Sequence, residues 1–325
     1  MIKNVCDLLV KNSDEVKKAT GFWGYDMMNK AAALSATLKG EVLDSEKLKE
    51  KIEMIKKNTS AFSYFRGITQ TILAMECSIN NYEKDDLLNI LEIYKSLKSE
   101  GASSSEYLVT CALNIYKNRY KFEISSMVRK TRETYKVMRK NHPFLTGAED
   151  YIMASIISFK AINIDDATVE IEKCYRYLKE RFMASDELQT LSHIMYFVPG
   201  EAKEKCYGTI NLYDMFKNEK IRVRYVKTLL PILDLVCEDK GRLIEEIKNT
   251  DEYLKQFKGF GNLSLGKDLR CLFAASIILS ENSKEYIDEI SGISESIITN
   301  IIIAMQIALM TAVIASSAAA ANSSS

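Results

Sequence analysis

Apolar residues recur three and four positions apart along most of this chain, and no stretch shows the alternation of a half-buried strand. Turn-like residues, for example at 101–105 and 141–147, divide the chain into segments of ordinary helix length. With three prolines in 325 residues, helices have few internal breaks. The pattern predicts an all-α protein with roughly fourteen or fifteen helices and no sheet.

A weak internal repeat has a period near 40 residues. In each copy a Tyr is followed, three and four residues later, by an apolar and a basic residue, and successive tyrosines are 41, 40 and 38 residues apart. A second helix then opens near an acidic residue, so each copy predicts a helical hairpin of about 40 residues. Such hairpins build HEAT-like α-solenoids or compact helical-repeat arrays, and either is expected here. The tyrosines are Tyr94, Tyr135, Tyr175 and Tyr213.

No Pro-rich or Ser-rich linker divides the chain, so we expect one helical-repeat domain over residues 1–292. Residues 293–325 are predicted to form an apolar, Ala-rich helix with a short polar tail, packed on the same domain. Residues 297–321 contain no charged side chain and are long enough to span a bilayer. Because their polar residues fall on one arc of the helix, a packed helix is favoured over a membrane anchor.

The composition narrows the classes of function. Forty-four basic residues balance 44 acidic ones, which argues against a general nucleic-acid binder. Seven cysteines without a C-x-x-C pair favour buried thiols over a zinc site or a disulfide framework. The first residues lack a secretion signal, so a cytoplasmic location is expected. No residue pattern specifies a cofactor or a resident metal.

Residues 261–267 match the nucleotide-binding pattern G-x-x-x-x-G-K. Asp268 stands where that loop needs a hydroxyl for magnesium, and no predicted strand precedes the segment. We therefore expect a loop between two helices, with Lys267 opening the second.

The stretch 117–140 holds nine basic residues against two acidic ones. On a predicted helix over 124–138 the apolar residues share one face, which places the basic residues on the opposite, solvated face. The alternative is a patch for an anionic ligand, RNA or an acidic partner. Its residues would be Arg129, Lys130, Arg132, Lys136, Arg139 and Lys140.

The two histidines lie in consecutive copies of the repeat. One hypothesis places both in a groove between hairpins, as a metal site or an acid–base pair. The favoured interpretation is a loop histidine docked on a helix end and a buried helix histidine, because no metal-binding spacing is present. The candidate groove residues are His142, Thr146, Glu149, Asp150, Gln189 and His193.

Several of these segments resemble the uncharacterised Firmicutes family called domain of unknown function 4003. The resemblance covers nearly the whole chain and implies a bacterial, cytoplasmic setting without implying an activity. The residues that carry it are the YKSLK sequence from Tyr94, HPFLTG from His142 with Asp150, the Ile171-Glu172 and YRYL segments, QTLSH ending at His193, and the Ala-rich end.

The absence of a catalytic motif favours an interaction scaffold that binds a protein or peptide through a groove, and disfavours an enzyme. Two alternatives stay open. One is a small-ligand or metal-binding enzyme around His142 and His193, and the other is an adaptor tethered to a membrane through 297–321.

Overall fold

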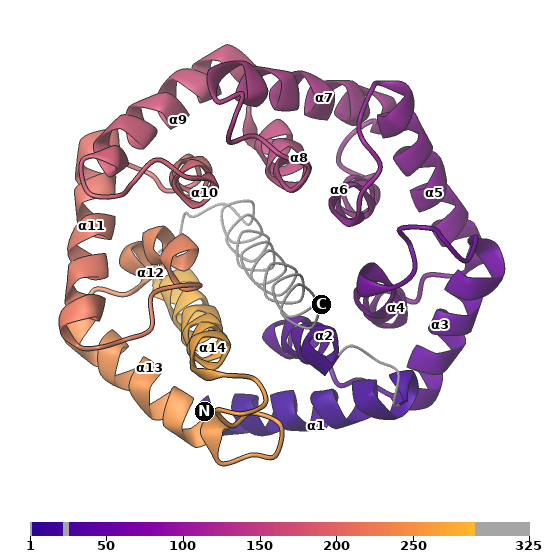
Figure 1. The fold of residues 1–325 in the computed structure, drawn as a ribbon, viewed down its shortest axis with the longest axis horizontal. Coiled ribbons are helices and arrows are strands. Elements are labelled where there is room, and N and C mark those ends of the chain that lie inside the picture. Colours follow the sequence, from indigo (N-terminus) through magenta and orange to yellow (C-terminus); the bar gives the residue numbers. More distant parts are fainter. Residues whose placement is uncertain (1, 22–25, 290–325) are drawn as a thin grey trace, which may run out of the picture. The chain divides into compact units, whose positions relative to one another are not determined.

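The computed structural model describes residues 2–21 and 26–289. This part contains fourteen α-helices, one short 3-10 helix and no strand (Figure 1). The prediction of an all-α protein is therefore confirmed for the described residues. None of their helices is long and apolar enough to cross a bilayer. The predicted C-terminal helix, with the proposed anchor at 297–321, lies outside the described residues.

The described residues form two compact units. Unit 2 comprises residues 12–21, 26–36 and 41–169, and unit 1 comprises residues 2–11, 37–40 and 170–289. Three of the four boundaries fall inside helices, namely α1 (Ile2–Thr20), α2 (Asp26–Leu38) and α9 (Ile164–Lys179), and the fourth follows Gly40. A single helical-repeat domain over 1–292 stays a prediction.

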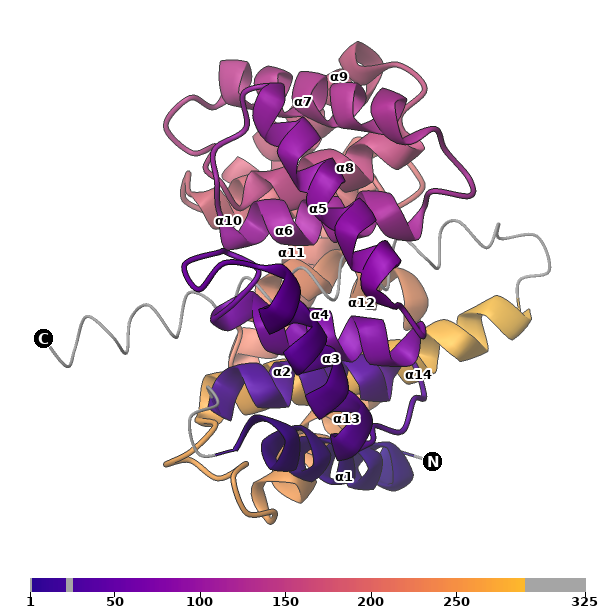
Figure 2. The ribbon, with the colours of Figure 1, turned by 90° about the vertical axis from the view of Figure 1, so that its right-hand side faces the viewer.

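Unit 2 has two layers of helices. Neighbours within each layer touch, and each helix of one layer also packs on the helix that follows it in sequence (Figure 1). Figure 2 shows α3 and α5 in front of the second layer. One layer is α3 (Ser45–Asn58), α5 (Lys84–Ser99) and α7 (Ile124–Asn141), and the other is α4 (Ile68–Ile79), α6 (Glu106–Lys117) and α8 (Asp150–Lys160).

Local sequence explains where these helices begin and what they bury. Ser105 Oγ accepts a hydrogen bond from the backbone N–H of Leu108 at 3.1 Å, which caps the start of α6. The four apolar residues of the repeat motif, namely Leu97, Met138, Leu178 and Phe216, are all buried in the core. Of the repeat tyrosines, Tyr135 and Tyr175 are buried, and Tyr94 and Tyr213 are half-buried.

Unit 1 contains the second half of the described helices together with residues 2–11 of α1. The Tyr253 hydroxyl donates a 2.9 Å hydrogen bond to Asp7 Oδ1, so residues far apart in sequence meet in this unit. As expected, residues 261–266 form a loop and a helix opens at Lys267. The helices are α10 (Asp186–Met195), α11 (Ala202–Asn218), η1 (Lys227–Leu229), α12 (Leu230–Val236), α13 (Lys240–Lys255) and α14 (Lys267–Glu289).

All seven cysteines are buried, free thiols, as the sequence predicted. They act as small apolar side chains at helix contacts. Burial raises the pKa of Cys111 to about 12, which makes it a poor nucleophile.

Candidate functional site

A groove of about 440 Å³ runs along one face of α7 in unit 2. Four basic residues of α7 line this groove. The last three follow the first, Arg132, by four, seven and eight positions, so all four share one face of the helix. Helix α7 also supplies Tyr135, and the loop after α5, the loop after α7 and helix α8 supply the other lining residues. The lining residues, here called the Arg132 groove, are Gly101, Ser103, Arg132, Tyr135, Lys136, Arg139, Lys140, Pro143 and Tyr151.

Arg132 forms the buried end of the basic row. Its side chain donates to the Glu100 carbonyl from Nε at 2.8 Å and to the Tyr151 hydroxyl from Nη1. Only 8% of the residue is exposed. The prediction that the basic residues of this helix all face solvent is therefore wrong for Arg132, because a carbonyl and a hydroxyl from neighbouring elements hold its guanidinium inside.

Two tyrosines stack beside this guanidinium. The rings of Tyr135 and Tyr151 are parallel to within 3°, with centroids 3.9 Å apart. Arg132 Cζ lies 5.5 Å from one centroid and 5.6 Å from the other, within cation–π range. Burial raises the pKa of Tyr151 to about 12, although the positive charge of Arg132 opposes the shift. Tyr151 therefore stays a neutral hydrogen-bond partner across the physiological range.

Gly101 lets the loop after α5 approach Arg132. Its φ is +89°, and its backbone N–H closes the helix end through a 2.8 Å bond to the Lys98 carbonyl. A Cβ at this position would lie 3.2 Å from Arg132 Nη2. Glycine thus serves both the left-handed backbone and the close contact.

The open part of the groove is strongly positive. Lys136, Arg139 and Lys140 are exposed, and no described residue that lines the groove has a carboxylate. Burial raises the pKa of Tyr135, and the negative charge of Asp150 adds to the shift. Asp150 is itself buried, and its Oδ2 accepts from the Gly147 N–H at 2.9 Å. The groove is therefore suited to an anionic ligand.

The other two residues of the predicted patch face elsewhere. Arg129 and Lys130 line a separate depression with Glu133 and Asp165, where acidic side chains offset their charge. Lys130 donates to the Ala161 carbonyl, and burial lowers its pKa. The six-residue patch proposed from the sequence is thus divided between two faces of α7.

The His142 segment closes the far end of the groove through Pro143. Helix α7 ends before His142, which is half-buried, and the Thr146 N–H donates to the His142 carbonyl at 3.0 Å. The next helix begins at Asp150, because residues 147–149 form tight turns first. Glu149 occupies the N-cap position of this helix, but its side chain accepts no capping hydrogen bond.

Gln189 and His193 lie in α10 of unit 1, and both are buried. His142, Thr146, Glu149 and Asp150 belong to unit 2. The six candidate residues are thus divided between the two units, and the hypothesis that they form one groove stays a prediction. In the described ranges, no group of three or more His, Cys, Asp or Glu side chains could hold a metal ion.

Sequence reasoning missed Gly101 and Tyr151 as members of the site. Tyr151 sits in the apolar run of α8, which is typical of a core position. Its hydroxyl was the available signal, since a buried tyrosine oxygen requires a partner. Gly101 followed a predicted helix end, but its neighbour Arg132 is 31 residues away in sequence.

The chain matches the model of a protein family. No curated protein and no solved structure matches the chain. One family model, described as "Protein of unknown function (DUF4003)", matches residues 12–308. That range covers most of the chain, including the whole Arg132 groove, and it agrees with the resemblance seen in the HPFLTG and QTLSH segments. The chain belongs to the DUF4003 family.

Proposed function

We propose that the protein is a helical-repeat scaffold that binds an acidic segment of a partner protein in the Arg132 groove. The observation that carries this proposal is the row of four cations along α7 in a groove without a lining carboxylate. Electrostatic complementarity of this kind selects a partner and accelerates its association.

The scaffold part of the proposal rests on the repeat and on the packing inside unit 2. The 41-residue step from Tyr94 to Tyr135 takes the chain from α5 to α7, and these two helices touch. Helices α5 and α6 pack as one hairpin, and α7 and α8 pack as the next. Stacked hairpins of this type form stable, exposed grooves that serve as binding surfaces.

The dimensions favour an extended peptide. Arg132 and Lys136, and then Lys136 and Lys140, are one helical turn apart, which is about 6 Å along the axis. Alternate side chains of an extended peptide on one face are about 6.6 Å apart. A segment with Asp or Glu at alternate positions would therefore bring successive carboxylates to successive cations.

Arg132 gives the groove a fixed recognition point. Its hydrogen bonds to Glu100 and Tyr151 orient the guanidinium before a ligand arrives, which lowers the entropic cost of binding. Phe144 follows the lining residue Pro143 and is 97% exposed. This ring can add an apolar contact to a partner that extends beyond the charged row.

The test is a binding titration, by fluorescence anisotropy, with a fluorescein-labelled peptide that carries Glu at alternate positions. A Gln version of the peptide is the negative probe. We expect the variant K136E/R139E/K140E to bind the peptide about 100-fold more weakly than wild type. Each substitution replaces an attractive ion pair with the peptide by a repulsive one, and each weakens the binding free energy by about 1 kcal/mol.

The matched control is K57E/K84E/K121E, which has the same net charge and changes three exposed lysines of unit 2 outside the groove. It should bind within about threefold of wild type at physiological salt. Equal affinity of both triple variants would show that binding is non-specific. Tighter binding of a single-stranded RNA oligomer of equal charge would reject a protein partner.

A further inference from the structure

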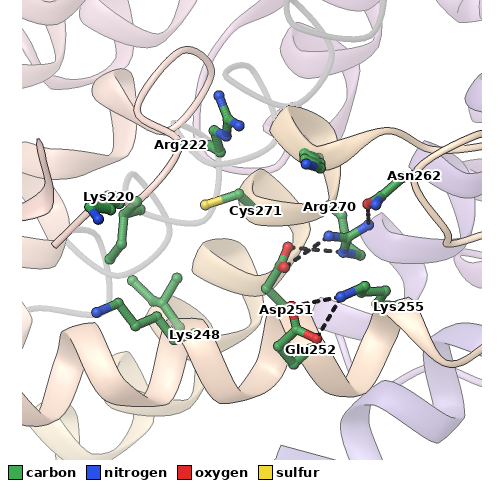
Figure 3. A pocket seen from close by; sticks show the side chains of 12 residues that line it. Lys220, Arg222, Lys248, Asp251, Glu252, Lys255, Asn262, Arg270 and Cys271 are labelled. Atoms are coloured by element: carbon green, nitrogen blue, oxygen red, sulfur yellow. Dashed lines mark hydrogen bonds and ion pairs between the residues drawn. The ribbon is translucent and has the colours of Figure 1, made fainter.

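Unit 1 contains a cavity of about 430 Å³ among α13, α14 and the loop after α11. Figure 3 shows Lys220 and Lys248 on one side of this cavity and the pair of Asp251 and Arg270 on the other. We call it the α13–α14 pocket. It shares no residue with the Arg132 groove, so its role is a separate question.

The pocket lining has six cationic residues and two acidic ones. Both carboxylates are already bound: Asp251 accepts two 3.0 Å bonds from Arg270, and Glu252 accepts a 2.8 Å bond from Lys255. Of the other four lining cations, Lys248 donates to Glu219 Oε2 at 2.7 Å, and Arg222 lies 4.0 Å from Asp268. Lys220 and Lys267 also line the pocket, and the lining residues together keep a net positive charge.

Arg270 builds the floor of the pocket. It is 2% exposed, and besides Asp251 it donates to the Phe260 carbonyl at 3.2 Å and to Asn262 Oδ1 at 2.9 Å. Because protein acceptors occupy its guanidinium, Arg270 holds the loop before α14 in place. The cavity is therefore formed before any ligand binds.

Lys220 has an unusual backbone for a lysine. It follows the end of α11 with φ of +60°, and its N–H bonds to the Lys217 carbonyl at 3.1 Å. Glycine is the residue that takes this position at least cost. A strained residue whose side chain lines a charged pocket points to a role for that side chain.

We propose that the α13–α14 pocket binds a small phosphorylated organic anion. Lys220, Arg222 and Lys267 face the phosphate groups, which prefer several cations at close range. Arg222 lies 4.0 Å from Asp268, and a phosphate competes for the same guanidinium. The uncharged part of the ligand packs on the buried wall, which includes Ile221 and Ile247.

The experiment is isothermal titration calorimetry with pyrophosphate and, in parallel, with ATP in magnesium-free buffer. We expect both to bind, and ATP more tightly because it also fills the apolar wall. The variant K220G should weaken both about tenfold, the loss of one charged contact. It should also keep the thermal stability of wild type, since glycine adopts a positive φ freely.

Two controls make the outcome decisive. K258A removes a lysine that is exposed in unit 1 but does not line the pocket, and it should bind both anions like wild type. The triple variant K136E/R139E/K140E should do the same, which separates this pocket from the proposed peptide groove. The proposal would be overturned if neither anion bound at about 1 mM. It would also be overturned if K136E/R139E/K140E lost anion binding while K220G bound both anions like wild type.

Discussion

The hydrogen bond between Tyr151 and Arg132 gives the sharpest test of how the groove is built. The variant Y151F removes the hydroxyl and leaves the ring, so the 3.9 Å stack on Tyr135 is preserved. Tyr151 is 2% exposed and Arg132 is 8% exposed, so water cannot easily replace the lost partner. The change therefore isolates one buried, charge-assisted bond.

The expected effect follows from that burial. A hydrogen bond to a charged group contributes about 1.5–3 kcal/mol, and a buried charged donor left without its acceptor accounts for most of the loss. We expect Y151F to lower the free energy of unfolding by about 2 kcal/mol. Urea unfolding followed by circular dichroism measures this, and an unchanged m value would show that the effect is on stability.

A double-mutant cycle with R132M assigns the loss to this pair. The coupling energy should be about 1.5 kcal/mol, because after R132M the hydroxyl has no cation to hold. The surface pair of Tyr120 and Arg119, joined at 2.8 Å, is the control, and Y120F should change stability by less than about 0.5 kcal/mol. A coupling energy below about 0.5 kcal/mol would refute the reasoning.

Three further predictions concern the same features. Both glycines have positive φ, so the backbone cost of alanine is common to G101A and G200A, but only a Cβ at 101 meets Arg132. G101A should therefore destabilise by about 1 kcal/mol more than G200A, which denaturant titration checks. Burial raises the pKa of Cys111 and of Tyr151 to about 12, from 9.0 and 10.0, so the folded state holds these protons more tightly than the unfolded chain. Stability should thus be complete below about pH 9 and fall as pH rises toward 12, and melting curves at increasing pH that stay flat would contradict it. All seven cysteines are buried, so a thiol reagent should label them fully only after unfolding.

The helices and the core were predictable because their signals are local. The spacing of apolar residues predicted the all-α class, and α14 begins at Lys267 as the sequence predicted. The repeat residues Leu97 and Phe216 are buried within this helical pattern. Each of these features depends on residues within one or two helical turns.

The site was only partly predictable because its key contacts are distant in sequence. The basic stretch predicted a cationic face on α7. The burial of Arg132, however, depends on a carbonyl 32 residues earlier and a hydroxyl 19 residues later. Helical periodicity cannot supply such pairings. The α13–α14 pocket shows the same limit, since Lys220 and Arg270 come to line one pocket through folding rather than through any motif.

The most direct test of the central claim is amide hydrogen exchange on the whole protein, with and without the alternating Glu peptide. Binding in the Arg132 groove predicts added protection in peptides that span the end of α7 and the loop after α5, at residues 132–143 and 101–103. The Gln peptide should change neither region. Protection confined to other parts of the chain, or none at saturating peptide, would contradict the account.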